Sequence, residues 1–87
     1  MIEPIELWSV IAPAFPGAEI EVVDQTGTLD HFEVRIVSAA FAGKSLLESH
    51  RLAMAAVRPA IEDGRVHAVT WKTYTPEQWA GRARRRI

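Results

Sequence analysis

Apolar and polar residues follow a helical period in the middle of the chain, between the glycines at positions 43 and 64. Apolar residues recur there at three- and four-residue spacing, which predicts one buried stripe made of Leu47, His50, Met54, Val57 and Ile61, with Leu46, Ala53 and Ala60 beside it. Ser45 can cap the start of this helix, and Ser49 lies off the stripe or at its margin. Pro59 lies inside the pattern, so a kink or an early end is expected near Arg58.

The segments on either side of this helix alternate apolar and polar residues with a period of two, which is typical of half-buried strands. The pattern predicts strands at Ala18–Asp24, His31–Ser38 and Arg65–Lys72. The first two are joined by a polar turn and most simply form an antiparallel hairpin. The third is reached through the helix, which favours a parallel pair.

A short helix is predicted at each end of the chain. Residues Pro4–Phe15 form the first, with Leu7 and Ile11 on its apolar side. The second begins at Thr75, which can cap it together with Gln78 in a capping box. We expect Trp79 to anchor this last helix to the body, and Phe41 to fill the edge of the core. The predicted order is α-β-β-α-β-α, an α+β fold with a three-stranded mixed sheet.

Composition limits the class of protein. Residues 1–87 are expected to form one small domain with a basic tail at about 82–87. The formal net charge is −1, so bulk charge predicts neither nucleic acid nor an acidic membrane as a partner. No apolar run reaches membrane-spanning length and no signal peptide is evident, so a cytoplasmic location is the default expectation. The sequence favours a monomer or a weak homodimer.

The chain contains no cysteine. This excludes disulfides, a cysteine nucleophile and a thiolate metal site made by this chain alone. The sequence also has no glycine-rich phosphate loop, no serine nucleophile motif and no metal-binding helix, so an enzyme is not indicated.

Two segments, HFEVRIVSAAFAGKSLLESHRLAMAAV and VHAVTWKTYTPEQW, resemble the BolA family. The matching positions are His31-Phe32, Val37-Ser38, Phe41, Gly43, Leu47, His50-Arg51, Val66-His67-Ala68, Lys72, Thr73, Thr75-Pro76 and Trp79. The resemblance implies a class II KH-like fold and no catalytic activity. It also implies partnership with monothiol glutaredoxins in handling a [2Fe-2S] cluster. Some bacterial members of the family also act as DNA-binding regulators of stress and cell shape.

Each iron in such a cluster binds two bridging sulfides and two further ligands, usually thiolates, so a chain without cysteine must share the cluster. A glutaredoxin thiolate and a glutathione thiol could hold one iron, and imidazole from this chain could help hold the other; the isolated chain would bind no cofactor. His67 matches the ligand histidine of the family in the third strand. The alternative interpretation of His67 is a partly buried strand residue that bonds to a carbonyl.

The sequence offers several candidates for the second iron ligand. Family members place a cysteine or histidine in the turn between the first two strands, where this chain has Thr28, Leu29 and Asp30, with His31 at the end. His31 is either the second ligand or a structural residue, and Asp30 ranks below it. The remaining histidine, His50, is expected at the core edge, hydrogen-bonded between helix and sheet. No two histidines have the close spacing of a zinc site.

Four basic residues could bind phosphate groups: Lys44, Arg51, Arg58 and Lys72. A KH domain that holds a nucleic-acid strand usually has a Gly-x-x-Gly turn, which this chain lacks. The turn at residues 42–45 could still offer backbone N–H groups to a phosphate at the helix start. The alternative is that Arg51 and Lys72 form ion pairs.

The sequence therefore favours a non-enzymatic adaptor that docks a monothiol glutaredoxin through the third strand and the start of the last helix. In this hypothesis His67 and His31 bind iron. The alternative is a KH-like DNA-binding transcriptional regulator of the stress response and cell morphology.

Overall fold

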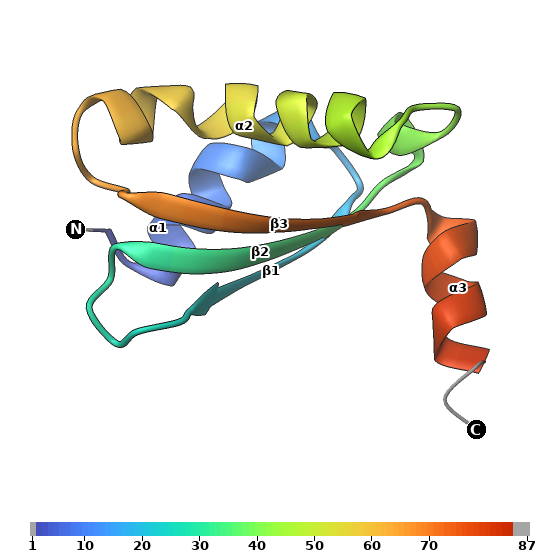
Figure 1. The fold of residues 1–87 in the computed structure, drawn as a ribbon, viewed down its shortest axis with the longest axis horizontal. Helices are drawn as coiled ribbons and strands as arrows, with labels where there is room; N and C mark the ends of the chain where they lie inside the picture. The colour runs from blue at the N-terminus through green and yellow to red at the C-terminus, as the bar shows by residue number, and fades with distance from the viewer. Residues whose placement is uncertain (1, 85–87) are drawn as a thin grey trace.

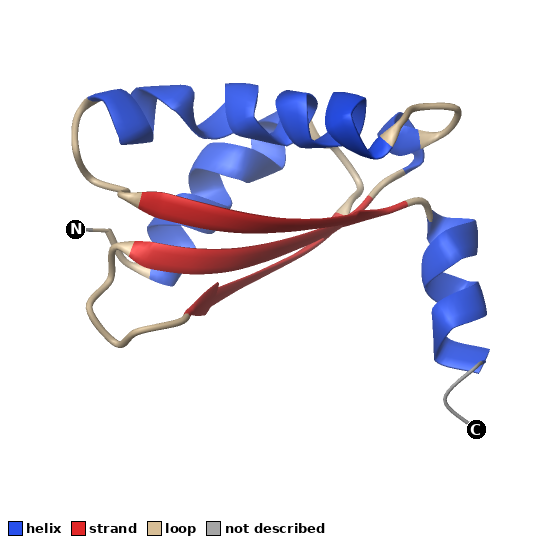
Figure 2. Cartoon of the chain, in the orientation of Figure 1, coloured by secondary structure: helices blue, strands red, loops and turns tan. Residues whose placement is uncertain are grey.

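The computed structural model describes residues 2–84, and their elements follow the predicted order (Figure 2). In chain order these are α1 (Pro4–Ile11), the 3-10 helix η1 (Ala12–Ala14), β1 (Glu19–Asp24), β2 (His31–Val37), the 3-10 helix η2 (Ala39–Phe41), α2 (Leu46–Glu62), β3 (Ala68–Tyr74) and α3 (Pro76–Arg84). The α+β class is confirmed. The first predicted helix is divided, because its last part adopts the tighter 3-10 form as far as Ala14.

The three strands form one mixed sheet in the order β1-β2-β3. β1 and β2 are antiparallel, and β2 and β3 are parallel with His31 opposite Ala68. Both predicted pairings are therefore confirmed. Helices α1 and α2 lie on one side of the sheet, whereas α3 projects from the far end of β3 toward the other side (Figure 1).

The core lies between the sheet and the two helices. In the central strand β2, Phe32, Val34 and Ile36 are fully buried on the helix side, and the alternate residues Glu33 and Arg35 face the open side. Full burial of an apolar side chain of this size stabilises the fold by about 1.5–3 kcal/mol. The other large buried side chains of the core are Ile2, Leu7, Ile11, Phe15, Phe41, Val57, Val66 and Trp71. Phe41 contacts Phe15 at a ring-centroid distance of 5.3 Å, which confirms its place at the core edge.

Helix α2 faces the sheet with only part of the predicted stripe. Val57 and its predicted neighbours Ala53 and Ala60 are buried, together with Ser49, which the pattern places off the stripe or at its margin. Leu46, Leu47 and Met54 are 67%, 59% and 36% exposed, so their predicted burial is wrong. The physical reason is close packing, because small side chains let the helix backbone approach the sheet while longer ones stand at the margin.

Pro59 does not end α2. The helix continues to Glu62, so the early end predicted near Arg58 is wrong. Proline removes one N–H donor from the helix but keeps its carbonyl, and the Asp63 N–H donates to the Pro59 carbonyl oxygen at 3.1 Å. The last turn is therefore still hydrogen-bonded.

The third strand begins and ends later than the predicted Arg65–Lys72. The N–H groups of His67 and Ala68 both donate to the backbone oxygen of Asp30, at 3.0 and 3.2 Å. The Val66 N–H donates to the Ala60 oxygen at 3.2 Å. The segment before Ala68 is therefore tied to the neighbouring turn and to α2, and regular pairing starts only at Ala68.

The start of α3 is the predicted capping box. The Thr75 N–H donates to Gln78 Oε1 at 2.8 Å, and the Gln78 N–H donates to Thr75 Oγ1 at 3.1 Å. Trp79 contacts the sheet as expected: its ring lies 4.3 Å from the Arg35 guanidinium carbon and 5.2 Å from the Tyr74 ring centroid. Part of the predicted basic tail, residues 85–87, lies outside the described residues. Within residues 2–84 no helix combines the length and apolar character needed to cross a bilayer.

Replacing Ser45 by alanine should lower the free energy of unfolding by about 1 kcal/mol. Ser45 Oγ accepts the N–H of Glu48 at 3.1 Å, and Glu48 Oε1 accepts the N–H of Ser45 at 2.9 Å, so the substitution breaks a reciprocal cap. Urea denaturation measures the change. Ser9→Ala is the matched control, since that exposed hydroxyl only donates to the Ile5 oxygen within α1. Equal losses in both variants would contradict the cap.

Candidate metal centre

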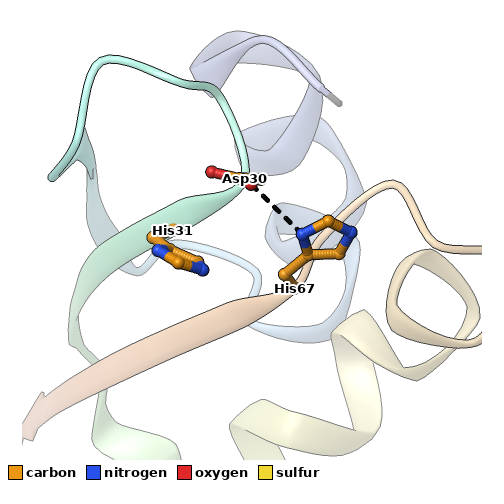
Figure 3. Close-up of side chains that lie close together, drawn as sticks. All are labelled: Asp30, His31 and His67. Atoms are coloured by element: carbon orange, nitrogen blue, oxygen red, sulfur yellow. Dashed lines mark hydrogen bonds and ion pairs between the residues drawn. The ribbon is translucent and has the colours of Figure 1, made fainter.

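Two histidines meet at one end of the sheet. His31 is the first residue of β2, and His67 immediately precedes β3. Because these strands are parallel, their starts lie at the same end, and the two ring centroids are 6.3 Å apart (Figure 3). The fold therefore brings together the two residues that the sequence predicts as iron ligands.

A carboxylate lies beside this histidine pair. Asp30 Oδ2 is 3.1 Å from His67 Nδ1, as the dashed line in Figure 3 marks. One coordinating atom from each of Asp30, His31 and His67 lies within 4.8 Å of the others. We call these three residues the His–Asp cluster. The set forms through strand pairing rather than through close spacing in the sequence, which the histidines lack.

The β1–β2 turn holds the cluster in place. The Asp24 carboxylate accepts the N–H groups of Thr26, Gly27 and Leu29 at 3.1–3.3 Å. Gly27 and Leu29 have φ angles of 76° and 60°. For Leu29 this left-handed conformation costs roughly 1–2 kcal/mol. Its carbonyl also accepts the Ile2 N–H at 3.2 Å, so hydrogen bonds on both sides stabilise the strained residue.

The His–Asp cluster is accessible to a partner. The His67 side chain is 61% exposed and the Asp30 side chain 21% exposed, and His31 is also exposed. Imidazole and carboxylate are both iron ligands in proteins. These three side chains fit part of a metal coordination shell, and thiolate ligands would have to come from another molecule.

The pKa of the Asp30 carboxyl lies below its ordinary value. The Thr28 hydroxyl donates a hydrogen bond to it, which is the largest cause; the nearby His31 and the contact with His67 act in the same direction, while desolvation opposes them. Asp30 is therefore an anion over the whole neutral range, and it faces the imidazole of His67 as a hydrogen-bond acceptor.

Asp30→Asn should destabilise the protein at neutral pH and have a diminishing effect in acid. A carboxyl whose pKa is lowered by folding contributes stability above its ordinary pKa of 3.8, and the contribution disappears as the pH falls through the lowered value. Urea denaturation of both proteins across a pH series measures the difference. A difference that stays constant into acid would show that the Asp30 charge does not stabilise the fold.

Thr28 occupies the turn in which the family resemblance expects a cysteine or histidine ligand. Its hydroxyl contacts Asp30 rather than lying free at the surface. Asp30, which ranked below His31 in the sequence analysis, is the residue that hydrogen-bonds His67. The sequence carried no signal for this pair, because the predicted third strand, Arg65–Lys72, contains His67; in the structure Asp30 and His67 each immediately precede one of two parallel strands.

His50 lies away from the described cluster, on α2. It is half-buried, as expected at the core edge, but its Nε2 atom is buried without a hydrogen-bond partner among the described residues. The predicted hydrogen bond is therefore not found at this nitrogen.

The four predicted phosphate-binding residues do not form one surface. Lys44, Arg51 and Arg58 are exposed at the start and along the outer side of α2. Lys72 lies on the opposite, open side of the sheet, where its Nζ pairs with Glu33 Oε1 at 3.3 Å. The ion-pair interpretation thus holds for Lys72. For Arg51 the described residues include no ion pair.

The start of α2 is poorly suited to a phosphate. The backbone hydrogen bond from Ser45 lowers the pKa of Glu48, so a carboxylate already occupies this helix end. A phosphate at residues 42–45 would meet that negative charge at close range, which offsets the attraction of the helix dipole.

Comparisons with known proteins identify the family and match the fold. The sequence model of the family described as BolA-like protein matches residues 12–78. The acid stress protein IbaG of Escherichia coli K12 is 34% identical over 79 residues, which cover 91% of this chain and 90% of IbaG. The crystal structure of a bol-like protein from Babesia bovis aligns with a TM-score of 0.82 at 27% identity, covering 95% of each chain. The solution structure of yeast Fra2 aligns with a TM-score of 0.74 at 31% identity, covering 91% of this chain and 85% of Fra2.

Proposed function

This chain belongs to the BolA-like protein family, and we propose that it is a non-enzymatic partner of a monothiol glutaredoxin that shares a [2Fe-2S] cluster with it. The observation that carries the proposal is the His–Asp cluster, which places two exposed imidazoles at one end of the sheet. The family resemblance supports the partner class, and the geometry supports the two histidines as ligands.

The number of ligands explains why the [2Fe-2S] cluster would be shared between this chain and a glutaredoxin. A [2Fe-2S] cluster takes four ligands besides its sulfides, and two histidines can replace two cysteines on one iron. In our proposal His67 is the first ligand from this chain and His31 the second. The glutaredoxin thiolate and a glutathione thiol take the other iron. Because histidine ligands can be protonated, the shared cluster is suited to transfer or sensing.

The position of the two histidines is the basis for proposing where the glutaredoxin binds. His67 precedes β3, and α3 follows its other end, so seven strand residues separate them by about 20 Å. We propose that the glutaredoxin contacts the β1–β2 turn and the start of β3, rather than the start of α3 that the sequence analysis included. The exposed Thr28 and His31 lie on this surface.

A titration tests the shared-cluster function. Cluster-loaded monothiol glutaredoxin from the same cell is mixed with increasing amounts of this protein and followed by visible absorption and circular dichroism. We expect the spectrum of the glutaredoxin cluster to change and to saturate when one chain is bound for each cluster. An unchanged spectrum with no complex would refute the function and favour the nucleic-acid regulator.

DNA binding is the second candidate, and the geometry supports it less. Its basic residues lie on opposite sides of the sheet, and Glu48 occupies the helix start nearest Lys44. A short DNA duplex titrated at two salt concentrations tests it, because phosphate contacts make affinity strongly salt-dependent. A variant with Lys44 and Arg51 replaced by alanine would lose such binding and would keep the cluster.

A further inference from the structure

Asp30 contacts His67 through both its backbone and its side chain. The Asp30 backbone oxygen accepts the His67 N–H at 3.0 Å, and Asp30 Oδ2 lies 3.1 Å from His67 Nδ1. The second carboxylate oxygen, Oδ1, accepts the Thr28 hydroxyl. Both oxygens of this carboxylate are therefore engaged, one by the turn and one by the imidazole.

We propose that Asp30 is a positioning residue for His67, which holds the proton on Nδ1 and leaves Nε2 as the atom that binds iron. The inference rests on the proposed shared cluster and adds to it the choice of ligand atom. An ionised carboxylate can only accept hydrogen bonds, so the imidazole nitrogen that faces it must carry the hydrogen. In neutral histidine the other nitrogen then carries the lone pair that a metal requires.

The exposure of His67 agrees with this assignment. Figure 3 shows Nδ1 directed toward Asp30 and the other ring nitrogen directed away from it. With 61% of the side chain exposed, that outer edge of the ring is open to a partner molecule. Metal-binding histidines commonly donate their second N–H to a carboxylate in this way, which fixes the ring and raises its basicity as a ligand.

Residues of the β1–β2 turn also hold the Asp30 carboxylate in place. Thr26 Oγ1 and Thr28 Oγ1 are 2.5 Å apart, and Thr28 donates to Asp30. The Asp24 carboxylate fixes the backbone of the same turn through Gly27 and Leu29. Here the turn therefore serves to orient a histidine on the neighbouring strand, rather than to supply an iron ligand from Thr28.

Direct ligation of iron by Asp30 is the competing role. The carboxylate would then have to release Nδ1 of His67 and turn toward the metal. The two roles differ before any cluster is present, because only the positioning role specifies which nitrogen of His67 is protonated in the isolated chain.

Long-range nitrogen–proton NMR correlation on the isolated, labelled protein makes this test at about pH 8, where histidine is neutral. We expect the Nδ1–H form of His67 in the wild-type protein and a shift toward the Nε2–H form in Asp30→Ala. Asp30→Asn keeps the shape of the side chain and should give a mixture, since an amide can donate as well as accept. Asp63→Ala is the charge-matched control; Asp63 bonds Arg65, and its removal should leave His67 unchanged. The Nε2–H form in wild type, or no change in either Asp30 variant, would overturn the inference.

The loaded complex provides the second measurement. In the mixed complex with a glutaredoxin, Asp30→Ala should lose its cluster to a chelator about 10- to 100-fold faster than wild type, whereas its spectrum should keep the histidine-dependent form. A spectrum that changes as it does on loss of His67 would identify Asp30 as a direct ligand and overturn the positioning role. A cluster held through His67 in its Nε2–H form would overturn only this inference. Absence of any shared cluster would refute the proposed function, and with it a ligand role for Nε2.

Discussion

His67→Ala should abolish the histidine-dependent spectrum of the cluster shared with a monothiol glutaredoxin and speed cluster loss by more than about 100-fold, beyond the range typical of outer-shell changes. His67 is largely exposed, and hydrogen bonds to Asp30 hold both its backbone and its ring. No thiol in this chain can replace it, since the sequence has no cysteine. Visible circular dichroism and the rate of iron loss to a chelator measure the two effects.

Two further variants make the His67 experiment specific. His31→Ala should weaken the shared cluster if His31 is the second ligand, and should leave it unchanged if His31 is structural. His50→Gln removes the third histidine, which lies on α2 outside the His–Asp cluster, and should leave the spectrum as in wild type. A His67→Ala complex with the wild-type spectrum and lifetime would show that the ligand assignment is wrong.

Phe32→Ala should lower the free energy of unfolding by about 3–5 kcal/mol. Phe32 is fully buried in the central strand, between the sheet and the helices, and is the largest of the completely buried side chains. The loss would remove a large share of the roughly 5–15 kcal/mol that stabilises a typical domain. Urea denaturation followed by far-ultraviolet circular dichroism measures it.

Leu47→Ala is the informative control for Phe32→Ala. The sequence pattern placed Leu47 on the buried stripe of α2, whereas the structure exposes most of its side chain. We therefore expect a change within about 0.5 kcal/mol, as for ordinary surface substitutions. A loss near that of Phe32→Ala would support the original stripe and contradict the observed orientation of α2.

The bounds of the two hairpin strands were predicted to within one residue, whereas the face that α2 turns toward the sheet was predicted only in part. Alternation in Phe32, Val34 and Ile36 reports burial directly, because a strand has only two sides. Helix α2 has apolar residues around much of its circumference, so periodicity alone did not select among them. Ala53 and Ala60 face the sheet, because their small side chains allow the helix backbone to approach it closely.

The candidate site was predicted in part. His67 followed from the resemblance, His31 as the second ligand was one of two interpretations left open, and the structure brings the two rings together. The contact between Asp30 and His67 was not predicted, because it depends on where β3 begins and on the left-handed residues of the turn. Hydrophobic periodicity locates strand ends only to within a few residues, and a leucine at a positive φ angle is not expected from propensity.

The two hydrogen bonds to the Asp30 backbone oxygen also affect how this region opens. The amides of His67 and Ala68 share that single acceptor, so the loop between the first two strands and the lead-in to the third form one cooperative unit of local unfolding. Fraying of β3 at this end breaks both hydrogen bonds to the loop, and a rearrangement that moves the Asp30 carbonyl frees both amides to exchange with solvent. A partner that binds either segment therefore also reduces the motion of the other segment, without contacting that segment.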